Sequence, residues 1–250
     1  VFNVRCDIHM ESHLNDLTEK NLDRIQSLGV ENLSMGIESL QERHLRFLER
    51  PYSTEAAKDT VRRVMRRGCQ CVNVDLMFAL PGQTCHELQQ AAGELVELGV
   101  DQVATYPLFY FPYTRMGSRG RPGNFGLRTI LRRRKQIRVL ERLFYSAGYE
   151  RSSVWAFTKR GVPKYCSVTV PLYLGLGASG GSYLKDIFFL NTFSVTEYIR
   201  AIQERQTAIA LSLDLSEEMQ MAGWLYWRIY ETRFRKCDFM ERFGQHFDEV

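Results

Sequence analysis

The sequence predicts an α/β fold, in which a partial TIM-like (β/α)6 barrel is followed by a mainly helical C-terminal appendix. Four segments read as parallel strands with a helical stretch between each and the next: residues 4–10, 32–37, 72–74 and 102–106. Three of them lead into an acidic residue, and the fourth leads into a cluster of aromatic rings. In a β/α barrel the carboxyl ends of the strands meet at one mouth, where ligands bind. These acids are therefore the first candidates for a binding site.

The first two helices are defined by their apolar spacing and their end signals. Residues 16–28 carry apolar side chains at helical intervals and end at Gly29, a good C-terminal stop. Residues 32–37 follow as a strand. Thr54 is expected to cap the next helix, with Glu55 in its first turn and Gly68 at its end.

The next strand and helix have equally clear signals. Residues 72–80 are almost continuously apolar, as expected of a strand that is buried on both faces, and Pro81 and Gly82 break it. Thr84 and Glu87 have the spacing of a capping box for a helix that runs to Leu98. Repeated strand–helix–strand order implies parallel pairing with right-handed crossovers.

The pattern changes after Pro112. Residues 115–126 read as a loop, 127–147 as a basic amphipathic helix, 149–157 as a strand, and 196–208 and 216–231 as helices. We expect a partial barrel over residues 1–126, a barrel-closing helix with a strand and a glycine-rich segment over 127–195, and a truncated helical domain over 196–250. Only about four to six of eight barrel strands are present, so we expect the chain to be the later part of a longer polypeptide.

The composition is that of a soluble globular protein, with 44% hydrophobic and 25% charged residues. The net charge of +4 is mild and does not indicate nucleic acid as a partner. No apolar run approaches the ~18–20 residues of a membrane span. The six cysteines follow no disulfide framework, so we expect reduced thiols and a cytoplasmic location.

Several segments together resemble one enzyme family. They are NLSMGIES at residues 32–39, LER at 48–50, NVDLMFALPGQT at 73–84, YLGLGA at 173–178, and the helix around residues 224–228. In this order they resemble the radical S-adenosylmethionine (SAM) family of oxygen-independent coproporphyrinogen III oxidase. The resemblance implies a [4Fe–4S] cluster and SAM as cofactors, a 5′-deoxyadenosyl radical that abstracts hydrogen, and anaerobic haem metabolism. It also implies a small-molecule substrate, such as a tetrapyrrole, and an electron donor such as flavodoxin or ferredoxin.

The resemblance and the residues together predict a SAM site made of Glu11, Glu38, Arg50, Asp75, Tyr106 and Phe109. The resemblance gives SAM contacts to Glu11 and Asp75, and it makes Arg50 the partner of the SAM carboxylate, for which a guanidinium fork is suited. Glu38 stands where oxidase-like members commonly have glutamine, and it could instead pair with Arg50 or Arg43. The aromatic pair Tyr106 and Phe109 fits either an adenine-stacking wall or the core. No catalytic residue is identified.

The cluster ligands are the main departure from the family pattern. These enzymes hold the cluster with a CxxxCxxC loop, and no such spacing occurs here, since Cys69 and Cys71 are too close. We expect the loop to lie upstream of Val1. The five histidines show no metal-ligand spacing, so no metal site is predicted within the chain: His9, His13, His44, His86 and His246.

Other interpretations remain open. A class C radical SAM methyltransferase, a haem chaperone and a cluster-free scaffold all fit the resemblance, although residues 163–168 lack the His-Asn-x-x-Tyr-Trp motif of the chaperones. The motif Gly175-x-Gly177-x-x-Gly180 imitates a dinucleotide fingerprint, but the following residues look β-like rather than helical. The basic run at residues 132–135 is typical of a solvated helix face, with a polycarboxylate substrate or a partner protein as alternatives.

Overall fold

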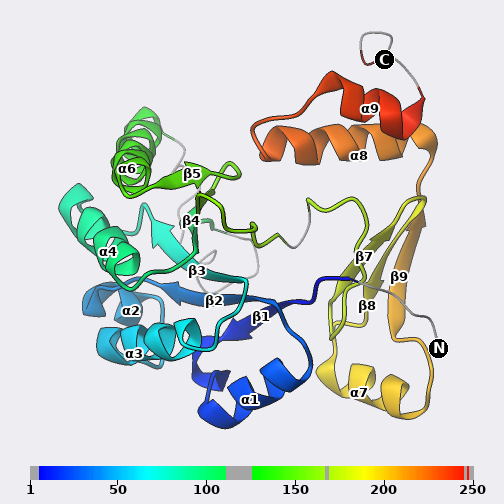
Figure 1. Cartoon of the computed structure of the whole chain (residues 1–250), viewed down its shortest axis with the longest axis horizontal. Helices are drawn as coiled ribbons and strands as arrows, with labels where there is room; N and C mark the ends of the chain where they lie inside the picture. Colours follow the sequence, from blue (N-terminus) through cyan, green and yellow to red (C-terminus); the bar gives the residue numbers. More distant parts are fainter. Residues whose placement is uncertain (1–5, 111–125, 167–168, 245–246, 248–250) are drawn as a thin grey trace. The chain divides into compact units, whose positions relative to one another are not determined.

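The computed structural model describes residues 6–110, 126–166, 169–244 and 247. The chain divides into two compact units, Val1–Tyr165 and Cys166–Val250 (Figure 1). The division falls inside the segment 127–195 that the sequence suggested as one part. Among the described residues, no helix has both the length and the apolar character needed to cross a bilayer.

The first unit is built on a mixed sheet of six strands in the order β1-β2-β3-β4-β6-β5. The four predicted parallel strands are confirmed: β1 (His9–His13), β2 (Asn32–Glu38), β3 (Cys71–Phe78) and β4 (Gln102–Pro107). The predicted strand at 149–157 is instead a hairpin of β5 (Tyr149–Arg151) and β6 (Ala156–Lys159), and β6 is antiparallel to β4.

Helices connect the parallel strands as the sequence predicts (Figure 1). They are α1 (Glu19–Ser27), α2 (Glu42–Phe47), α3 (Thr54–Met65) and α4 (Cys85–Glu97), followed after β4 by α6 (Leu127–Ser146); a short 3-10 turn, η1 (Leu14–Asp16), precedes α1. Their apolar side chains and those of the strands form one buried core, which includes Leu22, Leu33, Val74, Leu95 and Phe144.

Several predicted boundaries need correction. β1 spans His9–His13, so Glu11 lies within the strand and not after it. The cap of α3 is Ser53, whose side chain accepts the Ala56 N–H, and Thr54 is the first helical residue. The six-residue helix α2 was not predicted, because it is too short to show a helical period. The capping box of Thr84 and Glu87 on α4 is confirmed.

The strand register places two rows of side chains on one face of the sheet. One row is Glu11, Ser34, Asn73, Gln102 and Thr158, and the next is His13, Gly36, Asp75, Ala104 and Ala156. Alternate residues of a strand point to the same face, so both rows share it. The first row is polar throughout. This face is where the site lies.

The second unit contains an antiparallel sheet of β7 (Gly181–Leu184), β8 (Ile187–Asn191) and β9 (Ile209–Asp214), with helices α7 (Val195–Gln203), α8 (Glu217–Tyr230) and α9 (Lys236–Phe243). β9 lies in a stretch where no strand was predicted. The glycine-rich segment leads into β7 and not into a helix, which excludes a Rossmann site. A Cβ on Gly175 would collide with the backbone of Gly181, so close backbone packing explains that glycine.

Candidate functional site

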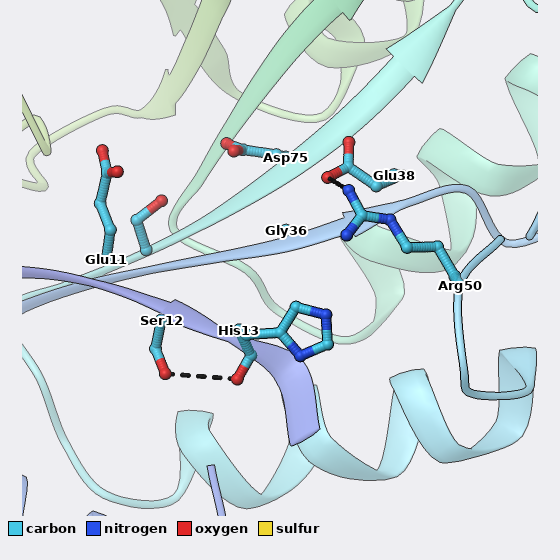
Figure 2. A pocket seen from close by; sticks show the side chains of 8 residues that line it. Glu11, Ser12, His13, Gly36, Glu38, Arg50 and Asp75 are labelled. Carbon is cyan, nitrogen blue, oxygen red and sulfur yellow. Dashed lines mark hydrogen bonds and ion pairs between the residues drawn. The ribbon is translucent and has the colours of Figure 1, made fainter. Parts of the chain in front are cut away.

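An open pocket of about 310 Å³ lies on the polar face of the first unit's sheet. It is lined by Glu11, Ser12, His13, Ser34, Gly36, Glu38, Arg50 and Asp75. Figure 2 shows that these residues come from β1, β2, β3 and the segment that follows α2. The structure therefore brings together the three predicted acids and the predicted arginine, which are up to 64 positions apart in the sequence (75 − 11).

Glu38 reaches the pocket through an unusual backbone. A bulge interrupts the pairing of β2 with β3 between Gly36 and Glu38, and Glu38 has a left-handed φ of 62°. A non-glycine residue in this region costs about 1–3 kcal/mol, and such strained residues are enriched at functional sites. A Cβ on Gly36 would lie 2.8 Å from Glu38 Oε1, so a larger residue there would displace the carboxylate from its present position. The Tyr52 hydroxyl donates to the Gly36 carbonyl at 3.1 Å and supports the bulge.

Glu38 and Arg50 form an ion pair inside the pocket. Arg50 Nη2 donates to Glu38 Oε1 at 2.5 Å, and the two side chains are 29% and 15% exposed. Burial raises the pKa of Glu38, and the charges of Arg50 and His13 oppose that rise. Arg43, the other cation considered as a partner, is bound to Glu87 at 2.6 Å instead. In the described part of the chain, the guanidinium of Arg50 donates through Nη2 alone, and its Nε is buried without an acceptor.

Asp75 is the most perturbed acid of the pocket. Burial raises its pKa to about 7, with further contributions from the negative charges of Glu38 and Glu11. Asn73 Nδ2 donates to Asp75 Oδ1 at 2.9 Å and, like the charge of Arg50, opposes this rise. No ion pair of Asp75 is found within the described residues, which argues against a purely structural salt bridge.

Glu11 lies at the more exposed side of the pocket and accepts a hydrogen bond from the Tyr165 hydroxyl at 3.2 Å. The pocket thus combines three carboxylates with one guanidinium and one imidazole. At neutral pH a ligand with localised positive charge gains from this imbalance, because unlike charges a few ångströms apart attract strongly in a partly buried site. The same carboxylates can accept hydrogen bonds from hydroxyl and ammonium groups.

The two predicted aromatic residues do not line this pocket. Tyr106 is half-buried on β4. Phe109 makes an edge contact with Trp155, with the ring centroids 6.3 Å apart. Their role beside adenine stays a prediction. The basic run of α6 also has structural contacts, since Arg132 donates to the Ala79 carbonyl and Arg133 to the Leu108 carbonyl.

Four lining residues were missed from the sequence: Ser12, His13, Ser34 and Gly36. Strand alternation from Glu11 would have found His13, and alternation back from Glu38 would have found Gly36 and Ser34. The mistaken bounds of β1 hid the first of these signals.

Within the described residues, no group of three or more histidine, cysteine, aspartate or glutamate side chains is arranged to hold a metal. The six cysteines are unpaired, and burial raises the pKa of Cys71 to about 12, which disfavours its thiolate. These residues do not fit an iron–sulfur cluster. The charged pocket, by contrast, fits a polar, partly cationic cofactor.

Comparisons with known proteins show what the chain is similar to. Residues 2–95 match the model of the radical SAM superfamily. The heme chaperone HemW of Lactococcus lactis is 24% identical over 253 residues, which cover 96% of this chain and 66% of that protein. An oxygen-independent coproporphyrinogen III oxidase of Cereibacter sphaeroides is 26% identical over 221 residues, which cover 81% of this chain and 47% of that enzyme.

A solved structure shows the same fold. The coproporphyrinogen III oxidase HemN from Escherichia coli, described as a radical SAM enzyme, superposes with a TM-score of 0.78 over 97% of this chain and 59% of that one, at 16% identity. The chain spans about half to two thirds of the length of the relatives it matches.

Proposed function

We propose that the pocket binds SAM for radical chemistry, because residues 2–95 match the radical SAM superfamily and the chain is similar to coproporphyrinogen III oxidases and HemW proteins. The observation that supports this most is the convergence of Glu11, Glu38, Asp75 and Arg50 on one pocket. These four residues come from separate elements, and the sequence alone predicts them as one site.

The donor set of the pocket suits the charges of SAM. The sulfonium and ammonium groups are cationic, and Glu11, Glu38 and Asp75 offer acceptor oxygens around the same space. Arg50 supplies the guanidinium for the SAM carboxylate. Glu38 shares Arg50 with that carboxylate, so it holds the arginine in place while it adds negative charge beside the sulfonium.

Glu11, Glu38, Arg50 and Asp75 would hold SAM, and bound SAM would supply a 5′-deoxyadenosyl radical for hydrogen-atom abstraction once a cluster outside the described residues gave it one electron. The described residues do not provide the cluster site, and the expectation that its ligands precede Val1 stays a prediction. The part of this chain is to bind SAM, orient it and limit the access of water.

For the substrate, we propose a tetrapyrrole, in an oxidase-like reaction of anaerobic haem metabolism. The homology to coproporphyrinogen III oxidases over 81% of the chain supports this class. An electron donor such as flavodoxin or ferredoxin follows from the same reaction type. A class C radical SAM methyltransferase would use the same pocket on a different substrate.

A second candidate is haem transfer. Several of the similar relatives are heme chaperones, and two of them match over 96% of this chain. In this case the tetrapyrrole would be cargo and not substrate. The missing His-Asn-x-x-Tyr-Trp motif counts against haem binding by the segment that carries this motif in the chaperones, but it does not exclude haem binding by other residues of the chain.

Two titrations of the purified chain test these proposals. Isothermal titration with SAM should show one binding event that Asp75→Asn weakens at pH 8, whereas Glu42→Gln, an exposed glutamate outside the pocket, should leave it unchanged. Absence of SAM binding by the wild-type chain would contradict the proposal. Titration with haem, followed by absorbance, distinguishes the two functions, since tight stoichiometric binding would favour the chaperone. A full-length parent, reconstituted anaerobically, should then release 5′-deoxyadenosine and decarboxylate a porphyrinogen if it is an oxidase.

A further inference from the structure

A row of buried polar side chains runs across the sheet beside the pocket. Ser34, Asn73, Gln102 and Thr158 stand at paired positions of β2, β3, β4 and β6, and each is at most 5% exposed. Buried polar groups cost free energy unless they are hydrogen-bonded, so such a row needs a reason beyond filling space. Of the four, Ser34 alone lines the pocket.

Gln102 is the most completely bonded member of this row. Its Nε2 donates to Asn73 Oδ1 at 3.1 Å and to the Tyr165 carbonyl at 3.0 Å. Its Oε1 accepts from the Thr158 hydroxyl at 2.8 Å and from the Tyr165 N–H at 3.0 Å. A glutamine amide has two donor hydrogens and two acceptor lone pairs, and all four are used. Only one orientation of the amide satisfies these partners.

This orientation fixes Asn73 in turn. Because Gln102 donates to Asn73 Oδ1, the Asn73 amide must turn its NH2 group to the opposite side. There Nδ2 donates to Ser34 Oγ and to Asp75 Oδ1, each at 2.9 Å. Asp75 therefore receives its hydrogen bond from an amide whose direction Gln102 sets.

The other end of the network reaches a second carboxylate. Gln102 holds both main-chain groups of Tyr165, and the hydroxyl of Tyr165 donates to Glu11 Oε1 at 3.2 Å. Glu11 and Asp75 are on different strands, and Gln102 connects to both through one residue each. We propose that Gln102 is a positioning residue that orients Asp75 through Asn73 and Glu11 through Tyr165 for a cationic ligand. The ligand in this statement rests on the proposed binding of SAM.

The charged groups that face Asp75 are all kept when Gln102 is replaced. They are Glu38 and Arg50 on one side and Glu11 and His13 on β1. A change at Gln102 leaves these charges in the chain and removes the hydrogen bonds that support Asn73 and Tyr165. If Gln102 merely satisfied its own burial, its replacement would lower stability without a specific effect on the ionisation of Asp75.

The test uses Gln102→Met, which keeps the length and approximate volume of the side chain but removes its hydrogen bonds. Gln136→Met is the matched control, because Gln136 is 1% exposed, donates to the Gln83 carbonyl at 3.1 Å and does not line the pocket. The pKa of Asp75 is measured in the ligand-free chain by carbon-13 NMR of labelled aspartate carboxyls, and Asp75→Asn identifies the resonance.

We expect Gln102→Met to raise the pKa of Asp75 by about one unit, which is the typical effect of losing one hydrogen bond to a carboxylate. Gln136→Met should leave it unchanged, and Thr158→Val, which removes one hydroxyl from Gln102, should raise it less. Thr158→Val also keeps the test available if Gln102→Met does not fold. An unchanged pKa of Asp75 in either folded Gln102 or Thr158 variant would overturn the proposal.

SAM affinity of the same variants separates this inference from the proposed function. At pH 7 Gln102→Met should weaken SAM binding about three- to tenfold relative to Gln136→Met, the range expected from about one lost hydrogen bond. If the wild type does not bind SAM but the pKa of Asp75 still rises in Gln102→Met, the proposed function fails and the network stands. If the wild type binds SAM and the two glutamine variants bind it equally, the positioning role fails alone.

Discussion

Glu38 offers the sharpest test of how the pocket selects its ligand. SAM and S-adenosylhomocysteine share the adenosine, the ammonium and the carboxylate, but only SAM carries a sulfonium charge. We expect Glu38→Gln to reduce the preference of the chain for SAM over S-adenosylhomocysteine. The ratio of the two dissociation constants is the useful quantity, because effects on the shared groups, including release of Arg50 to the ligand carboxylate, cancel in it.

The magnitude follows from the size of the pocket. A sphere of about 310 Å³ has a radius of about 4 Å, so a charge in the pocket lies roughly 6 Å from the Glu38 carboxylate once the side chain is allowed for. One pair of unit charges at that distance is worth about 0.7 kcal/mol in water and about 3 kcal/mol at an effective dielectric constant of 20. Glu38 is partly buried, so we expect an intermediate interaction energy of about 1.4 kcal/mol. This energy corresponds to about a tenfold change in the ratio of the two dissociation constants.

The assay is a pair of calorimetric titrations at pH 8, above the pKa of about 7 to which burial raises Asp75. Glu42→Gln is the control, since this substitution also removes one carboxylate charge, but from an exposed residue outside the pocket. The Glu42 carboxylate accepts a hydrogen bond from the Thr54 N–H. A ratio that stays within twofold of wild type in Glu38→Gln would refute the electrostatic reasoning. A ratio that falls equally in Glu42→Gln would assign the effect to net charge and not to the pocket.

Three further predictions follow from single residues of the structure. SAM affinity should rise from pH 6 to pH 8, because the pKa of Asp75 is raised to about 7 and the charged form attracts the cation; Asp75→Asn should flatten this profile in the same titrations. The raised pKa also means that Asp75 binds its proton more tightly in the folded chain than in the unfolded chain, so the free energy of unfolding should fall as the pH rises from about 4 through about 7. Urea unfolding at a series of pH values measures this, and the same dependence on pH in Asp75→Asn and in wild type would contradict it. Gly36→Ala should displace the Glu38 carboxylate from its ion pair with Arg50, because the added Cβ would lie 2.8 Å from Oε1, and the free energy of unfolding in urea should fall by about 1 kcal/mol. An unchanged free energy of unfolding would show that the carboxylate moves aside without loss.

The sequence was enough to predict the parallel half of the fold. The strands β2, β3 and β4 are marked by apolar runs, and the helices α3 and α4 by caps and terminal glycines, which are local signals. The hairpin β5–β6 was predicted as one strand, because its turn at Ser152 and Ser153 is held by hydrogen bonds to Ala156 rather than by a glycine or proline.

The site shows the same limit. Strand-end reasoning predicted that Glu38 and Asp75 lie in one place, and they do, but Asp75 lies within β3 and not at its end. The pairing of Asp75 with Gly36 brings it to the pocket. The ion pair of Glu38 with Arg50 depends on a left-handed residue and on a short helix, and neither has a sequence signal. The bonds that join Gln102 to Tyr165 link residues 63 positions apart, so they are visible only in the folded chain.

The position of β1 in the sheet has a consequence for how the pocket can be lost. β1 is the terminal strand of the six and pairs only with β2 among the described elements, yet it supplies Glu11 and His13. Terminal strands open at lower free energy than central ones. Amide hydrogens of β1 should then exchange faster than those of β3, and fraying of this one strand would remove two of the pocket's ionisable groups while the rest of the sheet stays folded.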